Sequence, residues 1–125
     1  MNRQQFEDWL TNYGKAWEEG DSDSVIKLFS EDVEYYETPF DIPLKGYREV
    51  YTYWKEGADE TQEDVRFEYE IICINDNSGY AEWQASFRRV PLGSNVKING
   101  ILSCEFDDRN KCRIFREWWH REETS

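Results

Sequence analysis

The chain has 125 residues, a length that suits one domain rather than two. It carries 27 acidic and 15 basic residues, which gives a formal net charge of -12. Nucleic-acid binding depends on a basic face that neutralises phosphates, so this balance excludes a DNA- or RNA-binding protein. It argues equally against binding to anionic membranes. Aromatic residues reach 17%, so we expect a core built largely from rings.

Neither a membrane-spanning run nor a leader-like segment with basic residues is recognisable in the sequence. The three cysteines, Cys73, Cys104 and Cys112, are an odd number and lack a CxxC spacing. We therefore expect neither disulfides nor zinc, and small thiols packed within strands instead. This usage fits a reducing compartment, and the sequence predicts a cytoplasmic protein.

The first half of the chain predicts three helices and one short strand. Residues 4–19 repeat apolar side chains with a period near 3.6, which indicates a helix with one buried stripe. A second, short helix begins at Asp21 and is expected to include Phe29. Residues 33–37 are β-prone, and a third amphipathic helix is expected at about 47–56.

Beyond residue 63 the apolar period changes to 2, which predicts strands. Four alternating segments begin near Val65, Ala81, Val96 and Cys112, and short turn sequences separate them. This order is typical of an α+β domain, here one domain over residues 1–125. We expect an antiparallel four-stranded sheet, with one additional short strand, curved into a cone around the helices. The mouth of such a cone is where a ligand pocket forms.

The segment YGKAWEEGD at residues 13–21, LFSEDV at 28–33, Pro39 and Gly46 together resemble the nuclear transport factor 2-like superfamily. This superfamily includes ketosteroid isomerases and SnoaL-like polyketide cyclases. The resemblance covers about residues 6–122 and implies a cystatin-like roll with a curved sheet. The resemblance to this superfamily does not by itself identify a function, because the fold hosts many chemistries.

The ketosteroid isomerases are the functional branch that the chain resembles most. That resemblance implies that Tyr13 polarises a carbonyl oxygen and that Glu37 moves the proton. In those enzymes a second, neutral acid helps to hold the enolate oxygen. Leu102 occupies the corresponding position here, so the pair of oxyanion donors is incomplete. Trp119 matches an aromatic residue of the cavity.

The residues themselves favour Glu37 as well, because it ends a short strand where the chain enters a loop, and a carboxylate there can act as general base or acid. The alternative is a glutamate on a solvated rim. Tyr13 lies on the buried stripe and could donate to a ligand or to a backbone carbonyl.

Glu117 alternates in phase with Phe115 and Trp119, so it could face inward and share acid–base work with Glu37. A bulge in the last strand would instead turn Arg116, Trp118 and His120 inward. His120 is the only histidine and is more simply a surface residue. The expected pocket-lining residues are Trp9, Trp17, Phe40, Trp54, Phe67, Trp83, Leu102, Glu117 and Trp119.

Two functions remain open. One is a cofactor-independent isomerase- or cyclase-like enzyme that moves a proton next to a carbonyl of a small apolar or aromatic molecule. The other is a non-catalytic module that binds such a ligand or forms a homodimer through the sheet. The expected outer face of the sheet favours the dimer, because it carries Ile72, Ile74, Ile101 and Trp118. No metal-ligand spacing or phosphate-binding loop is present, so no metal or cofactor is expected.

Overall fold

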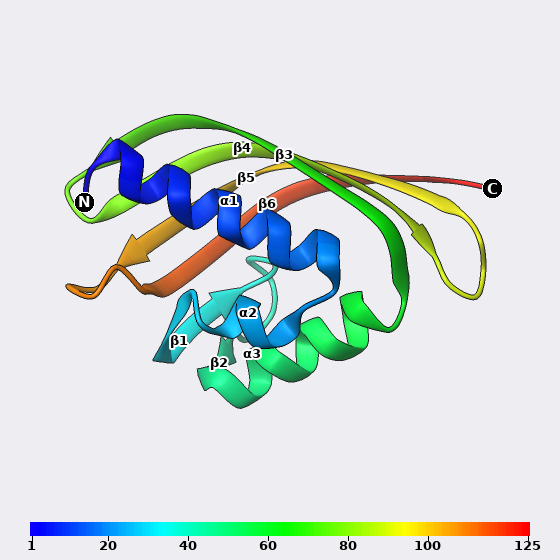
Figure 1. Cartoon of the computed structure of the whole chain (residues 1–125), viewed down its shortest axis with the longest axis horizontal. Coiled ribbons are helices and arrows are strands. Elements are labelled where there is room, and N and C mark those ends of the chain that lie inside the picture. The colour runs from blue at the N-terminus through cyan, green and yellow to red at the C-terminus, as the bar shows by residue number, and fades with distance from the viewer.

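A strongly curved sheet arches over the helices in the computed structural model, which describes residues 1–125 (Figure 1). In chain order the elements are α1 (Arg3–Glu19), α2 (Ser22–Ile26), β1 (Phe29–Tyr36), β2 (Leu44–Lys45), α3 (Gly46–Trp54), the π-helical turn η1 (Lys55–Asp59), β3 (Gln62–Asn75), β4 (Ser78–Arg89), β5 (Asn95–Phe106) and β6 (Cys112–Thr124). The α+β class and the order of helices before strands are as the sequence predicts.

The sheet has six strands in the order β2-β1-β6-β5-β4-β3. The four long strands form the expected antiparallel meander. The sheet is nevertheless mixed, because β1 runs parallel to β6. β1 is also longer than expected: α2 ends at Ile26, and Phe29 begins the strand instead of closing a helix. A fully buried Phe29 packs there against the rings of Trp9 and Phe115.

Helix α1 covers one end of the concave face of the sheet (Figure 1). Asn2 and Gln5 form a capping box at its start, and Gly20 ends it in the left-handed conformation with φ of 65°. Its apolar stripe, which includes Phe6 and Leu10, is buried against the strands. No helix of the structure combines the length and the apolar character needed to cross a bilayer.

Strand β6 has two neighbours along its first part and only one along its second part. The pairing with β1 stops at Tyr36 and Arg116, after which the chain leaves the sheet through the loop at 37–43. From Glu117 to Thr124, β6 is paired with β5 alone. The separation of β1 from β6 at this point leaves one long edge of β6 uncovered beside the loop.

A bulge in β3 between Ile71 and Cys73 corrects part of the expected face pattern. The extra residue turns Cys73 outward, where it is exposed, and turns Ile74 inward against the core. Cys104 is buried, as expected. The apolar outer face therefore keeps Ile72 and Ile101, with Trp118, but not Ile74.

Candidate functional site

A cavity of about 240 Å³ lies between the helices and the inner face of β4, β5 and β6. Ten of its fifteen lining residues are hydrophobic, and four of these are tryptophans. The lining residues are Tyr13, Trp17, Tyr35, Glu37, Tyr53, Trp54, Gly57, Ala58, Gln62, Trp83, Phe87, Ile98, Glu117, Trp119 and Arg121. The walls suit a flat apolar molecule, and the few polar groups decide how it would be oriented.

The side chain of Glu117, on strand β6, points into this cavity. Its neighbours Arg116 and Trp118 are exposed, whereas Phe115 is fully buried, so the odd-numbered residues of this stretch face inward. The parity in which Trp118 and His120 would face inward is not the observed one. Only 6% of Glu117 is exposed, which makes it the one buried carboxylate of the chain.

The environment of Glu117 favours its neutral form. Burial raises the pKa of Glu117 to about 8, and the nearby charge of Glu37 acts in the same direction. The hydroxyl of Tyr13 lies 3.5 Å from its Oε1, a long contact that acts in the opposite direction. No salt bridge reaches the carboxyl group. At neutral pH Glu117 is therefore mostly protonated and can donate a hydrogen bond.

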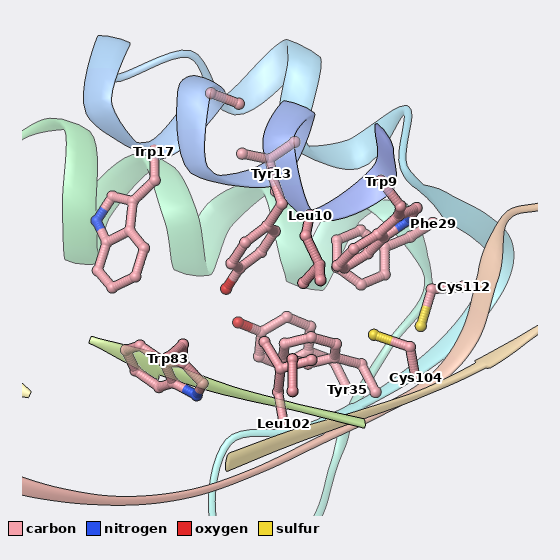
Figure 2. Packing of buried hydrophobic residues seen from close by; sticks show 14 of the residues in the cluster. Trp9, Leu10, Tyr13, Trp17, Phe29, Tyr35, Trp83, Leu102, Cys104 and Cys112 are labelled. Atoms are coloured by element: carbon pink, nitrogen blue, oxygen red, sulfur yellow. The ribbon is translucent and has the colours of Figure 1, made fainter. Parts of the chain in front are cut away.

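Two buried tyrosines accompany this acid. Tyr13 on α1 and Tyr35 on β1 are each about 1% exposed, and Figure 2 shows their hydroxyl oxygens pointing toward one another across the core. Burial, followed by the charge of Glu117, raises the pKa of both phenols, so both remain neutral donors. Tyr35 was not among the site residues predicted from the sequence. The alternation of Val33 and Tyr35 in the predicted strand was the available indication.

Glu37 was expected to be the last residue of the strand; in the structure β1 ends one residue earlier, at Tyr36, and Glu37 is the half-buried first residue of the loop. It lines the cavity together with Glu117. Burial, followed by the charges of Glu117 and Glu37, raises the pKa of the Tyr53 phenol on α3. The site thus contains two carboxyl groups in different surroundings, one enclosed by apolar walls and the other near solvent.

A groove of about 440 Å³ lies outside the two glutamates, between the loop at 37–41 and the uncovered edge of β6. Glu37, Glu117 and Trp119 line both the groove and the cavity, so the groove leads to the site. Phe40, expected in the pocket, borders this groove instead and is 93% exposed. Its loop has no strand or helix above it that could cover the ring.

Five of the expected pocket residues line the cavity, namely Trp17, Trp54, Trp83, Glu117 and Trp119. Trp9, Phe67 and Leu102 do not. Trp9 stacks on Tyr13 and donates to the carbonyl of Leu28, while Leu102 is fully buried where α1 approaches the sheet (Figure 2).

Phe67 packs against the rings of Tyr13 and Trp83. The periodic pattern gave the inward face correctly but could not tell which end of that face the helix fills.

Gly100 makes room for the cavity tryptophan on β6. It lies between Trp83 and Trp119 in the ladder, and a Cβ there would meet the Cβ of Trp119 at 2.6 Å. Its nearest neighbour would be the backbone carbonyl oxygen of Trp118, so a side chain at this position would displace the backbone of β6 together with the tryptophan. No group of three or more His, Cys, Asp or Glu side chains forms a potential metal site.

The comparisons with known proteins agree with this fold. The family model of the SnoaL-like domain matches residues 10–115. No curated protein matches the chain.

Among solved structures, the epoxide hydrolase/cyclase-like enzyme SalBIII, named for a role in pyran ring formation in the polyether salinomycin, superposes with a TM-score of 0.82 at 19% identity. That match covers 95% of this chain and 93% of SalBIII. The Δ5-3-ketosteroid isomerase from Mycobacterium sp. superposes with a TM-score of 0.81 at 14% identity, covering 96% and 98%. At these identities the two structures support the fold alone. With the family model spanning most of its length, the chain belongs to the SnoaL-like domain family of the nuclear transport factor 2-like superfamily.

Proposed function

We propose that this protein is a cofactor-independent enzyme that moves a proton next to a carbonyl group of a small apolar or aromatic molecule. The observation that carries the proposal is the buried Glu117, held neutral at the wall of an aromatic cavity beside Tyr13 and facing a second carboxyl group, Glu37. Two carboxyl groups whose surroundings push their protonation apart are the usual basis for dividing acid and base work.

The proposed roles follow from the surroundings. Glu37, near solvent, takes the α-proton of the carbonyl compound, so that the C–H bond breaks and the electron pair moves onto the carbonyl oxygen. Glu117 and Tyr13 donate hydrogen bonds to the resulting enolate oxygen. Glu37 then returns the proton to carbon, at the original position or a conjugated one. This proton transfer requires no cofactor.

Glu117 also offers a substitute for the acid that the ketosteroid isomerase pattern lacks at Leu102. Leu102 and Glu117 are direct partners in the β5–β6 ladder, and both face inward. Side chains of such partners start about 5 Å apart, so a carboxyl group at either position approaches the same part of the cavity. One well-placed oxyanion donor contributes on the order of a hundredfold to the rate.

The proposal is tested in two steps. A thermal-shift screen with small aromatic and apolar ketones identifies binders, because a ligand of the native state raises the melting temperature. Deuterium exchange at the α-carbon of each binder is then followed by proton NMR. Exchange by the wild type should fall at least a hundredfold in Glu37→Gln and in Glu117→Gln.

Glu34→Gln is the matched control. Glu34 lies on β1 three residues before Glu37 and accepts a hydrogen bond from Tyr36, and it does not line the cavity. Exchange that survives in both Glu37→Gln and Glu117→Gln at the rate of the Glu34 control would rule out the proposed chemistry.

A non-catalytic binding or dimerisation module is the second candidate, and the outer face of the sheet favours it. Ile72, Ile101 and Trp118 are 54%, 43% and 47% exposed there, and Ile101 and Trp118 are partners on neighbouring strands. Large exposed apolar side chains in one place suggest a homodimer through the sheet. A molecular mass in solution equal to one chain would rule out the homodimer. Either function suits the cytoplasm, where the three free cysteines stay reduced.

A further inference from the structure

Arg121 is the only cation that lines the cavity, and the mechanism above does not use it. It lies on β6 four residues after Glu117, on the same face of the strand. At the usual rise of a strand the two Cα atoms are about 13 Å apart. The cavity therefore has two chemically different ends, with Glu37 and Glu117 at one and Arg121 at the other.

The charges around Arg121 leave the second end positive. Its Nη2 donates to Oε1 of Glu123 at 3.0 Å. The same carboxylate accepts from Arg89 at 3.1 Å and from the hydroxyl of Ser94 at 2.6 Å. One carboxylate is thus shared by two guanidinium groups, so this cluster carries an excess positive charge. The hydroxyl of Ser94, followed by the two arginines, lowers the pKa of Glu123 to about 2, which keeps this carboxylate ionised at neutral pH.

Two indole N–H groups in the cavity walls have no acceptor. Trp54 and Trp83 are each 3% exposed, and neither Nε1 atom has a hydrogen-bond partner. The other two buried indoles are satisfied, since Trp9 donates to the carbonyl of Leu28 and Trp17 donates to Gln62. Both nitrogens lie within the walls with almost no accessible surface, so the polar groups that define the two ends for a bound molecule are Glu117 and Arg121.

We infer that the cavity takes a flat aromatic oxo acid, bound with its ketone oxygen at Glu117 and its carboxylate at Arg121. The placement of the ketone rests on the proposed function, whereas the placement of the carboxylate rests on Arg121 and Glu123. The reverse orientation would bring the ligand carboxylate against Glu37. The ligand supplies acceptors at both ends and rings between them, which matches a cavity rich in donors and aromatic walls.

The test uses para-acetylbenzoate, which has a methyl ketone and a carboxylate at opposite ends of one ring. The matched neutral probe is para-acetylbenzamide. Isothermal titration calorimetry on the wild type should show the acid binding at least tenfold more tightly than the amide, because a guanidinium–carboxylate hydrogen bond is stronger than a neutral one. Arg121→Gln should remove that preference.

Arg113→Gln is the control for Arg121→Gln. Arg113 lies on the same strand and pairs with Glu105 on the exposed surface, outside the cavity, so its loss should leave the preference for the acid intact. Glu123→Gln should change the affinity for the acid in the opposite direction. It frees both guanidinium groups, so the acid should bind more tightly than it does to the wild type.

No measurable binding of the acid, equal binding of acid and amide, or an acid preference that persists in Arg121→Gln would each overturn the inference. These outcomes are separate from a failure of the proposed chemistry. If one of these outcomes is found while deuterium still exchanges into the methyl ketone of the amide, dependent on Glu37 and Glu117, the proposed enzyme stands and the acid-binding end is refuted. Binding of the acid through Arg121 with no deuterium exchange would support the acid-binding end and refute the proposed chemistry.

Discussion

The two halves of β6 use the same alternation of inward side chains for different purposes. In the first half Phe115 is fully buried and packs against Trp9, Phe29 and Tyr35 under helix α1. In the second half Glu117, Trp119 and Arg121 face a cavity, and only β5 pairs with the strand. The difference shows that the cavity arises where α1 and β1 end relative to β6, and not from a change in the pattern of the strand.

Removing one ring from each half tests the difference in packing between them. Phe115→Ala should reduce the free energy of unfolding by about 3–5 kcal/mol, because it empties a fully packed site. Trp119→Ala should cost less than about 2 kcal/mol, because this half-buried ring already borders open space. Urea unfolding followed by circular dichroism measures both. Equal losses would mean that the second half is packed as tightly as the first.

Much of the difference between the two halves of β6 was predictable from the sequence, but the point along the strand where the cavity begins was not. The period of 2 indicated that β6 has one inward face but left open which residues lie on it, and the resemblance pointed to Tyr13, Glu37 and the fold. The sequence did not show that β1 stops pairing at Tyr36, which fixes the site of the groove and leaves Phe40 outside. Periodicity concerns each strand alone, whereas the edge of a cavity depends on where neighbouring elements end.

The bulge in β3 was equally invisible, because one extra residue leaves no mark on the composition and reverses every later side chain. The sequence also left undecided whether Glu117 is buried, for a related reason. A carboxylate in an alternating strand is compatible with either face until the partners of that strand are known.

A second test concerns the cost of burying an acid in the cavity half of β6. Below about pH 4.5 Glu117 is protonated in both the folded and the unfolded chain. As the pH rises toward 8 only the unfolded chain releases this proton, so the free energy of unfolding falls. By pH 7 the loss amounts to about 3 kcal/mol. The wild type should therefore lose stability relative to Glu117→Gln between pH 4.5 and 8, as measured by urea unfolding. Parallel curves would show that Glu117 is not buried as described.

Tyr13 connects the two halves, because it reaches from the packed half toward the acid of the cavity half. Tyr13→Phe removes the hydroxyl that lies 3.5 Å from Glu117 and partly stabilises its charged form. The pKa of Glu117 should rise further, by well under one unit, since the long contact is worth only about 0.5 kcal/mol. Carbon-13 NMR of the carboxyl group measures this shift, and a fall in the pKa would contradict the assigned direction.

The smallest effect on stability is expected on the outer face of β6. Trp118→Glu replaces a half-exposed ring opposite the cavity and should change the free energy of unfolding of the single chain by about 0.5 kcal/mol or less. If two copies associate through this face, the same change should convert a dimer into a monomer in sedimentation equilibrium. An unchanged mass would locate any self-association elsewhere.

The protonation of Glu117 at neutral pH is the claim on which the proposed chemistry depends most directly. A carbon-13 titration of the glutamate carboxyl groups, with Glu117 assigned by comparison with Glu117→Gln, measures it. The structure predicts one glutamate that titrates near pH 8, far above the ordinary value of 4.5. A Glu117 that titrates near 4.5 would be a charged residue at pH 7, and it could not act as the neutral donor proposed here.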